Sequence, residues 1–351
     1  MDPDRTREWL DGRVESGAFS GAVLVWRDGA PVFEHVGGLA HRGLGVPITS
    51  ETRFAVASVT KMATAICALR LVEQGRVALD NRVVDLLPTE HRPAALTPAV
   101  TLHHLLSHTS GLANYHDDSD PTLASFVANW DRLPTYHVRR PADLVPLFAD
   151  LPAVSRPGER YAYIDAGYIL VGLVIEAVTG RPCDEVITEE VFEPTGMKDT
   201  RFEALDHEPF RLATGYITDP DAPNGWRSNV FSVTAMGMPD GGMLTTTTDL
   251  ARLIDALVDG RLLSPDLLRA MTSPQGPADA EEPYGYGCHL VVEDGTVTII
   301  GHGGSDPGVS AEVSHYLEAG ITIVALCNQD RGAWAASLEL AAAMGLRDPR
   351  A

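Results

Sequence analysis

Short apolar runs with β-branched residues occur near both ends of the chain, and helical patterns lie between them. The runs at 22–26 and 32–36 flank an Asp-Gly turn, which predicts an antiparallel hairpin. Further runs predict strands close to the C-terminus, at 287–292, 297–300, 311–317 and 321–326. We expect the hairpin and these late strands to join in one antiparallel sheet, although they lie far apart in sequence.

The longest helical pattern follows Ser58, runs to Gln74 and stops before Gly75. Its residues are mostly apolar and Ala-rich, which predicts a buried helix with Ser58 at its start. Other helices are predicted at 5–16, 166–178, 248–258 and 333–343. The predicted fold class is therefore α+β, an antiparallel sheet flanked by N- and C-terminal helices with a large, mostly helical insert. Residues 1–75 and 281–351 form the discontinuous sheet domain, and 76–280 form the helical domain.

Composition narrows the classes of partner. The chain has 351 residues, of which 44% are hydrophobic and 21% are charged, as in globular proteins. A formal net charge of −21 argues against nucleic acid or an anionic membrane as the main partner. No apolar stretch reaches the ~20 residues needed to span a bilayer, and the first residues lack a leader pattern. The four cysteines form no CxxC pair. These features predict a cytoplasmic protein.

Ser58 and Lys61 have the spacing of a nucleophile and its activating partner. Serine needs a nearby base, and residues i and i+3 of a helix share one face. The chain has only two lysines, Lys61 and Lys198, so a Ser-x-x-Lys match is expected by chance roughly 0.1 times. Arginine cannot accept a proton, so a lysine in an arginine-rich chain suits a titratable role. The competing interpretation is a helix-capping serine followed by a surface lysine.

Three further motifs follow in order, at 105–112 (Leu-Leu-Ser-His-Thr-Ser-Gly-Leu), 157–165 (Pro-Gly-Glu-Arg-Tyr-Ala-Tyr-Ile-Asp) and 302–304 (His-Gly-Gly). With the Ser-x-x-Lys element, they make the chain resemble the β-lactamase-related serine hydrolases. That family includes class C β-lactamases, D-Ala-D-Ala carboxypeptidases, D-aminopeptidases and β-lactamase-like esterases. The resemblance runs from about Gly21 to Asn328, and it implies the β-lactamase/transpeptidase-like fold with the active site between the two domains.

The resemblance implies a role for each motif. Ser58 would be the nucleophile, and Lys61 would help to deprotonate it. Tyr163 matches the tyrosine of the family's Tyr-x-Asn element, which acts with the lysine as general base and then protonates the leaving group. Without the other motifs, Tyr163 would be interpreted as an aromatic residue of the hydrophobic core.

The third motif implies the oxyanion hole and part of the substrate site. Gly303 and Gly304 would let substrate approach the backbone of an edge strand. By analogy, the N–H of Ser305 would pair with that of Ser58 to hold the oxyanion. His302 would polarise the tyrosine or contact the substrate, although a histidine in a turn would give the same sequence pattern.

Two positions depart from the family pattern. Asp165 stands where the family has Asn or Ser, and a carboxylate there would pair with Lys61 and raise its pKa. That would move the base role towards Tyr163. His302 replaces a lysine that suits recognition of a carboxylate by point charge, so an esterase or amidase is favoured over a β-lactamase.

Other polar groups yield weaker predictions. His104 and His108 have the i, i+4 spacing of helical metal ligands, but the family match implies packing, and neither a metal nor a cofactor is expected. The segment 240–243 matches a family Gly-Gly segment near the cleft, where glycines leave space beside the backbone because they have no side chain. In the variable region that follows Leu112, three aromatic or histidine side chains could either line the pocket or belong to a surface loop: Tyr115, His116 and Trp130.

The predicted activity is cleavage of a small ester, amide or peptide through an acyl-enzyme on Ser58. A transacylase would use the same acyl-enzyme with an amine or alcohol as acceptor. A catalytically silent binding protein on the same scaffold is the third reading, and the intact Ser58, Lys61 and Tyr163 argue against it.

Overall fold

The computed structural model describes residues 1–116, 123–278, 280 and 282–351. Its helices are α1 (Pro3–Glu15), α2 (Thr60–Glu73), α3 (Val83–Leu86), α4 (Leu102–Leu106), α5 (Leu123–Arg132), α6 (Asp165–Thr179), α7 (Cys183–Ile187), α8 (Glu193–Thr195), α9 (Thr247–Val258), α10 (Pro265–Met271) and α11 (Ala333–Ala343). Its strands are β1 (Gly21–Arg27), β2 (Ala30–Gly37), β3 (Leu39–His41), β4 (Val46–Pro47), β5 (Phe54–Ala55), β6 (Tyr216–Thr218), β7 (Trp226–Ser228), β8 (Leu244–Thr245), β9 (His289–Glu293), β10 (Thr296–Asp306), β11 (Val309–Tyr316) and β12 (Ile321–Cys327).

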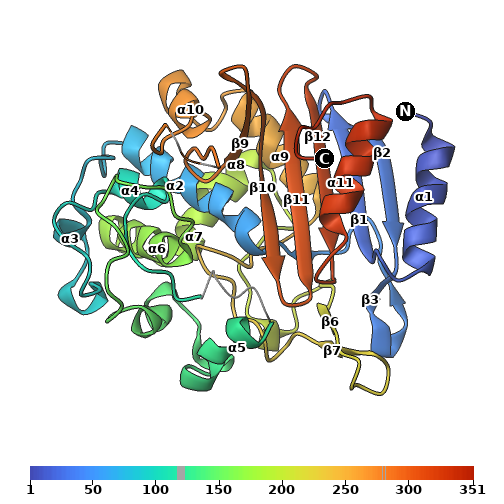
Figure 1. Cartoon of the computed structure of the whole chain (residues 1–351), viewed down its shortest axis with the longest axis horizontal. Helices are drawn as coiled ribbons and strands as arrows, with labels where there is room; N and C mark the ends of the chain where they lie inside the picture. Colours follow the sequence, from blue (N-terminus) through green and yellow to red (C-terminus); the bar gives the residue numbers. More distant parts are fainter. Residues whose placement is uncertain (117–122, 279, 281) are drawn as a thin grey trace.

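The main sheet has the strand order β2-β1-β12-β11-β10-β9, and all neighbours are antiparallel (Figure 1). The N-terminal hairpin joins the late strands where β1 pairs with β12, with Gly21 opposite Cys327. Between β1 and β2, Asp28 and Gly29 have φ values of 52° and 74°, as a two-residue hairpin turn requires. The predicted mixed architecture with one antiparallel sheet is confirmed.

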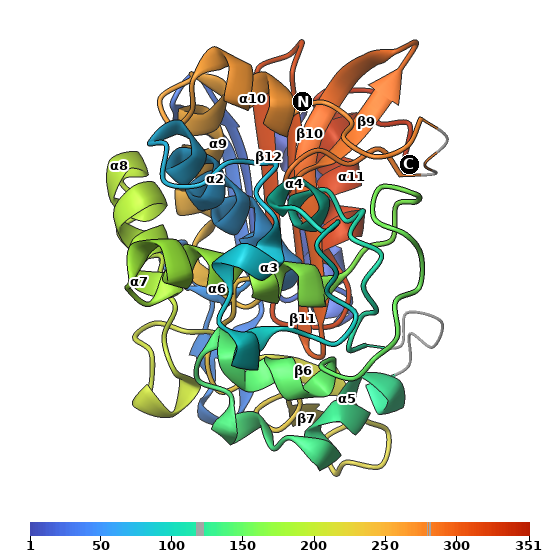
Figure 2. The ribbon, with the colours of Figure 1, turned by 90° about the vertical axis from the view of Figure 1, so that its left-hand side faces the viewer.

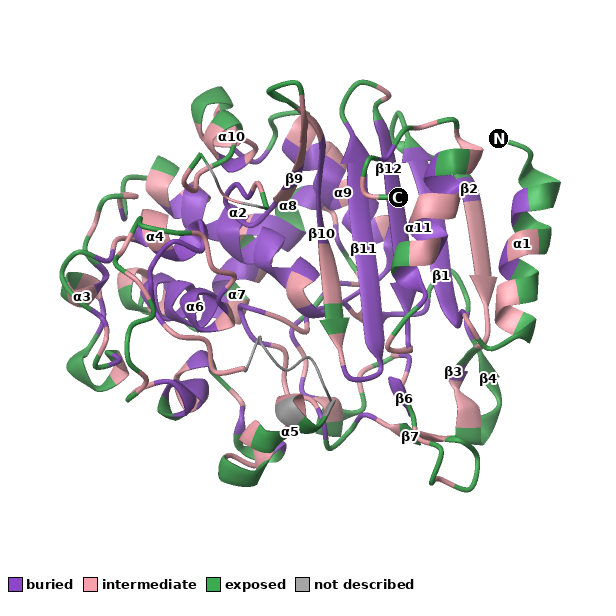
Figure 3. Ribbon diagram, viewed as in Figure 1, coloured by how far each residue is buried: buried purple, intermediate pink, exposed green. Residues whose placement is uncertain are grey.

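Both faces of the sheet are covered, which explains why β11 and β12 are buried at every position (Figure 3). Side chains alternate between the two faces of a strand. On β1, Val23 and Val25 pack in one cluster with Leu10 of α1 and Leu340 of α11. Leu24, from the same strand, belongs to the larger cluster on the opposite face. The terminal helices therefore cover one face, and the helical region covers the other.

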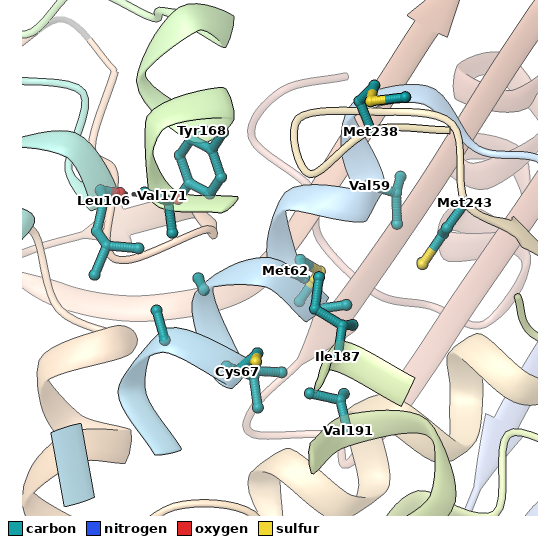
Figure 4. Close-up of a cluster of buried hydrophobic side chains, with 14 of the residues drawn as sticks. Val59, Met62, Cys67, Leu106, Tyr168, Val171, Ile187, Val191, Met238 and Met243 are labelled. Atoms are coloured by element: carbon teal, nitrogen blue, oxygen red, sulfur yellow. Dashed lines mark hydrogen bonds between the residues drawn. The ribbon is translucent and has the colours of Figure 1, made fainter. Parts of the chain in front are cut away.

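Helix α2 is the buried centre of the helical region. Met62 and Cys67 on α2 pack among apolar side chains that include Ile187 and Val191 (Figure 4). Figure 2, which views the molecule from the helical side, shows α4 and α6 in front of the sheet. The hydroxyl of Tyr168 on α6 donates to the carbonyl of Leu106 at the end of α4, at 2.9 Å. This bond joins α6 to α4 beside α2, and Ser58 lies in the turn that directly precedes α2.

The segment from 76 to 280 contains more than helices and loops. β6 pairs with β7, and β8 pairs with β5, but these strands have two or three residues each and are too short for a periodic signal. Helix α9 packs against β1 and β12 of the main sheet, so the segment also covers part of the sheet. The proposed boundary at 281 lies outside the described residues, and the division into two domains stays a prediction.

Within the described ranges, no single helix is long and apolar enough to cross a membrane. By length and composition alone, α6 and the segment Cys183–Thr195 taken together are long and apolar enough to cross a membrane, but the two are bent by 84° relative to each other.

Candidate active site

Ser58 lies in a short 3-10 turn, Ala57–Val59, that leads directly into α2. Ala57 has a φ of 45°, which residues with a Cβ rarely adopt. Its carbonyl accepts hydrogen bonds from the N–H of Gly242 at 3.2 Å and the hydroxyl of Thr60 at 2.7 Å. These contacts hold a strained turn that presents Ser58 to a cavity, and such strain is typical of functional positions.

Lys61 is fully buried and donates three hydrogen bonds from its ammonium group. The acceptors are Ser58 Oγ at 3.0 Å, Asp165 Oδ1 at 2.6 Å and the carbonyl oxygen of Asp240 at 2.6 Å. An ammonium has three N–H groups, so none of them needs to be left without an acceptor in this buried place. The expected ion pair between Lys61 and Asp165 is therefore present in the structure.

The charges around Lys61 keep it protonated. Burial is the largest single influence on the pKa of Lys61 and lowers it, but Asp165, Tyr163 and Asp240 together raise it by more, and Asp165 contributes most. The net effect is a pKa above the ordinary lysine value. Burial raises the pKa of Asp165, but the contacts with Lys61, together with His116 and Asn114, lower it to below its ordinary value. At neutral pH, Lys61 is an ammonium that donates to Ser58, so it cannot accept the serine proton.

Tyr163, two residues before the start of α6, completes the group around Ser58. Its ring centroid lies 4.9 Å from Lys61 Nζ. Burial raises the pKa of Tyr163 to about 12, although the positive charge of Lys61 and hydrogen bonding to Lys61 and Ser58 act in the opposite direction. The sequence thus located Tyr163 correctly beside the pair, and the structure adds that its resting form is the neutral phenol.

His302 lies on β10 and is buried, with both ring nitrogens occupied. Nδ1 is 2.6 Å from the carbonyl oxygen of Gly303, and Nε2 is 3.0 Å from the hydroxyl of Tyr284. A carbonyl oxygen only accepts, so we assign the proton to Nδ1, and Nε2 accepts from Tyr284. Burial holds the pKa of His302 well below its ordinary value. The ring is 6.1 Å from that of Tyr163, and it does not line the cavity among the described residues.

The free edge of β10 lies against the turn that carries Ser58. β10 pairs with β9 only as far as Gly301, but it pairs with β11 up to Asp306. A Cβ at Gly304 would lie 2.2 Å from the carbonyl oxygen of Val56 and 3.2 Å from the nitrogen of Ser58. Glycine is therefore required for this close approach. At Gly303, by contrast, an added Cβ would meet Glu312 Oε2 at 3.1 Å.

Ser58 opens into a cavity of about 260 Å³. Ser305, the next residue on β10 after Gly304, lines the same cavity, as does Asp165. Three residues that the sequence left between pocket and surface loop also line it: Tyr115, His116 and Trp130. The cavity thus combines Ser58, the predicted nucleophile, with aromatic walls.

In the part of the chain that the structure describes, no group of three or more His, Cys, Asp or Glu side chains is placed to hold a metal ion. His104 Nδ1 contacts the N–H of Thr101, and His108 Nδ1 accepts from the N–H of Ile164. Both rings serve local structure.

Sequence reasoning missed several groups at the site. The carbonyl of Asp240 holds Lys61, and a backbone acceptor has no sequence signature. Tyr284 holds His302, yet no motif distinguishes it from other aromatics. Asp306 lines the cavity, and its position two residues after the third motif was the available signal.

Comparison with known proteins gives a consistent result. A family model described as Beta-lactamase matches residues 6–344. The chain is 28% identical over 328 residues to penicillin-binding protein 4* of Bacillus subtilis (strain 168), covering 90% of this chain and 69% of that protein. It is 32% identical over 271 residues to the esterase EstB of Burkholderia gladioli, covering 71% and 68%.

A solved structure of a penicillin-binding protein from Bacillus halodurans is also similar. It has a TM-score of 0.87 and 34% sequence identity, and the match covers 95% of this chain and 99% of that chain. The ordered motifs, the fold and the nearly full-length family match agree. The chain therefore belongs to the beta-lactamase family of serine hydrolases.

Proposed function

We propose that this chain cleaves small carboxylic esters or amides through an acyl-enzyme on Ser58, with Tyr163 as the proton carrier. The observation that carries the proposal is the contact of Ser58 Oγ with Lys61 Nζ at 3.0 Å, beside Tyr163 and at the edge of a cavity. The similarity to EstB, which is named as an esterase, supports an ester as substrate.

In the acylation step, Ser58 Oγ forms a bond to the substrate carbonyl carbon while its proton passes to the Tyr163 phenolate. The carbonyl π electrons move to oxygen, and the N–H groups of Ser58 and Ser305 stabilise this oxyanion. When the intermediate collapses, the bond to the leaving alcohol or amine breaks, and Tyr163 returns the proton to it. In the deacylation step, water attacks the acyl group and gives its proton to Tyr163, and that proton returns to Ser58 Oγ as the acid leaves.

Lys61 acts in this scheme as a fixed positive charge. It donates to Ser58 Oγ and stabilises the Tyr163 phenolate, because Asp165 keeps it protonated. With a Tyr163 pKa of about 12, only about one molecule in 10,000 has the phenolate at pH 8. The rate of Ser58 acylation therefore rises with pH throughout the range in which the protein is folded.

The test is hydrolysis of p-nitrophenyl butyrate by the wild type and by Ser58→Ala. We expect turnover that is lost in the variant, with the urea unfolding midpoint of the variant close to that of the wild type. Release of one equivalent of nitrophenol without turnover, followed by turnover when an amine or alcohol is added, would make the chain a transacylase. No nitrophenol release above that of Ser58→Ala would contradict the proposal.

A further inference from the structure

The side chain of His302 is bonded to the backbone of its own strand. Nδ1 lies 2.6 Å from the carbonyl oxygen of Gly303, and Nε2 lies 3.0 Å from the hydroxyl of Tyr284. Burial, together with the charges of His289 and Lys61, holds the pKa of His302 well below its ordinary value, so the ring is neutral and has one proton. That proton is on Nδ1, because a carbonyl oxygen only accepts, and Nε2 then accepts from Tyr284.

The carbonyl of Gly303 lies on the free edge of β10. The N–H of Leu317 donates to the carbonyl of Thr298 at 3.0 Å, so in this ladder the even-numbered residues of β10 bond to β11. The odd-numbered residues turn their N–H and C=O groups to the other side, where β9 pairs with β10 only as far as Gly301. Gly303 and Ser305 therefore both present their backbone groups on the free edge.

This edge needs a fixed geometry, because the predicted oxyanion donor is the N–H of Ser305, two residues beyond Gly303. Such a donor is effective when it already points to the place where the oxyanion forms. Gly303 and Gly304 give the strand more backbone freedom than other residues would. β11 restrains Gly304 on one side. On the free edge, the hydrogen bond from His302 to the Gly303 carbonyl takes the place of a neighbouring strand.

Tyr284 reaches His302 from a well-supported position just before β9. Its side chain is buried, and its backbone carbonyl accepts from the N–H of Gln275 at 2.8 Å. Its ring meets the ring of His302 edge to face, with centroids 5.8 Å apart. A Cβ at the next residue, Gly285, would clash with the carbonyl oxygen of Met271, so the chain passes close to the end of α10. A donor fixed at Nε2 keeps the His302 proton on Nδ1.

We propose that Tyr284 is a positioning residue for the oxyanion hole. Its hydroxyl selects the tautomer of His302 that donates to the Gly303 carbonyl, and this bond fixes the strand edge that supplies the N–H of Ser305. The inference rests on the proposed acyl-enzyme at Ser58. Because the oxyanion exists only after attack, loss of the Tyr284 hydroxyl should lower kcat and kcat/KM together and leave KM nearly unchanged.

The tautomer is measured by ¹⁵N NMR of protein labelled at histidine, at about pH 7. The signal of His302 is identified by its absence in His302→Asn. We expect the wild type to show a neutral ring protonated at Nδ1. Tyr284→Phe keeps the aromatic ring but removes the hydroxyl, and it should shift His302 towards the ring protonated at Nε2.

Kinetics with p-nitrophenyl butyrate show whether the tautomer matters for the reaction. Tyr284→Phe should lower kcat by about 10- to 100-fold and keep KM within about threefold. Tyr286→Phe is the matched control, since the hydroxyl of Tyr286 is also buried against a histidine, His103 Nδ1, at 2.7 Å. It removes the same atom two residues further along the chain, and it should leave kcat and the His302 signal unchanged.

A double-mutant cycle shows whether Tyr284 acts through His302. In His302→Asn, the side-chain amide can still donate to the Gly303 carbonyl, but an amide has no tautomer for Tyr284 to select. Adding Tyr284→Phe to His302→Asn should therefore change kcat by less than about threefold.

The outcomes separate this inference from the proposed function. A kcat of Tyr284→Phe within about threefold of the wild type, a change in KM alone, or an equal loss in both backgrounds overturns the inference, and the acyl-enzyme at Ser58 stands. A wild-type His302 protonated at Nε2 also overturns it, and that result does not depend on the folding of Tyr284→Phe. If the wild type releases no nitrophenol from p-nitrophenyl butyrate, the proposed function fails and the inference fails with it.

Discussion

Replacing Asp165 by Asn changes the charge next to Lys61 and leaves the shape of the site nearly intact. The carboxylate oxygen lies 2.6 Å from Lys61 Nζ and holds that group as an ammonium. Asp165 also raises the pKa of Tyr163. Loss of this one negative charge therefore lowers the pKa of both groups that could take the proton from Ser58. We expect Asp165→Asn to speed the reaction of Ser58 with an acylating reagent at neutral pH.

The size of the effect follows from the contact distance. At an effective dielectric constant of about 20, two unit charges at this distance attract by about 6 kcal/mol. The amide oxygen of Asn recovers part of this energy, as do the remaining contacts of Lys61 with Ser58 and the Asp240 carbonyl. A free-energy difference of about 1.4 kcal/mol is a factor of ten in rate. If about a quarter of the ~6 kcal/mol is not compensated, the reaction at pH 7 becomes about tenfold faster. The buried ion pair is also lost, so we expect the free energy of unfolding to fall by about 3 kcal/mol.

The assay is the second-order rate constant for labelling by a fluorophosphonate, measured from about pH 6 to 10, because it reports activation of Ser58 without deacylation. In the wild type, the rate should rise about tenfold per pH unit without a plateau, since the pKa of Tyr163 is about 12. In Asp165→Asn, the curve should move to lower pH by at least about one unit. Asp240→Asn is the control, because Asp240 contributes less than Asp165 to the pKa of Lys61. An unchanged curve in Asp165→Asn would refute the reasoning.

Two further variants test the proton carrier and the strand edge. Tyr163→Phe should reduce kcat for p-nitrophenyl butyrate at least as much as Lys61→Ala does, by about 100-fold or more, and a near-normal rate in Tyr163→Phe would remove Tyr163 as the base. Gly304→Ala should reduce kcat/KM by about 100-fold and the free energy of unfolding by about 1–3 kcal/mol, because its Cβ would lie 2.2 Å from the carbonyl oxygen of Val56. Gly303→Ala, whose Cβ meets only a side-chain oxygen of Glu312 at 3.1 Å, should lose less of both.

The sequence predicted the parts of the fold that carry a clear period. β1 and β12 are apolar at successive positions because both faces of the sheet are covered, and the Asp-Gly turn marked the hairpin. The apolar run of β10 ends at residue 300, and only the family resemblance placed Gly303 and Gly304 on an edge strand; in the structure β10 continues to Asp306. Glycines have low strand propensity, so pairing with β11 rather than local preference extends this strand.

The candidate site was predictable where chemistry depends on side-chain type and order. Ser58, Lys61 and Tyr163 meet as the motifs implied, and Asp165 contacts Lys61 as its charge suggested. The raised pKa of Tyr163 was not predictable, because it results from burial by residues distant in sequence. The partner of His302 was also hidden, since Tyr284 carries no motif.

Identification of the residue that carries the acyl group tests the central claim most directly. The wild type is incubated with p-nitrophenyl butyrate, quenched in acid within the first turnover, digested and examined by mass spectrometry. A butyryl group on the peptide that contains Ser58, absent in Ser58→Ala, is the predicted result. Hydrolysis without any acyl group on Ser58, or a butyryl group that forms equally in Ser58→Ala, would contradict the account.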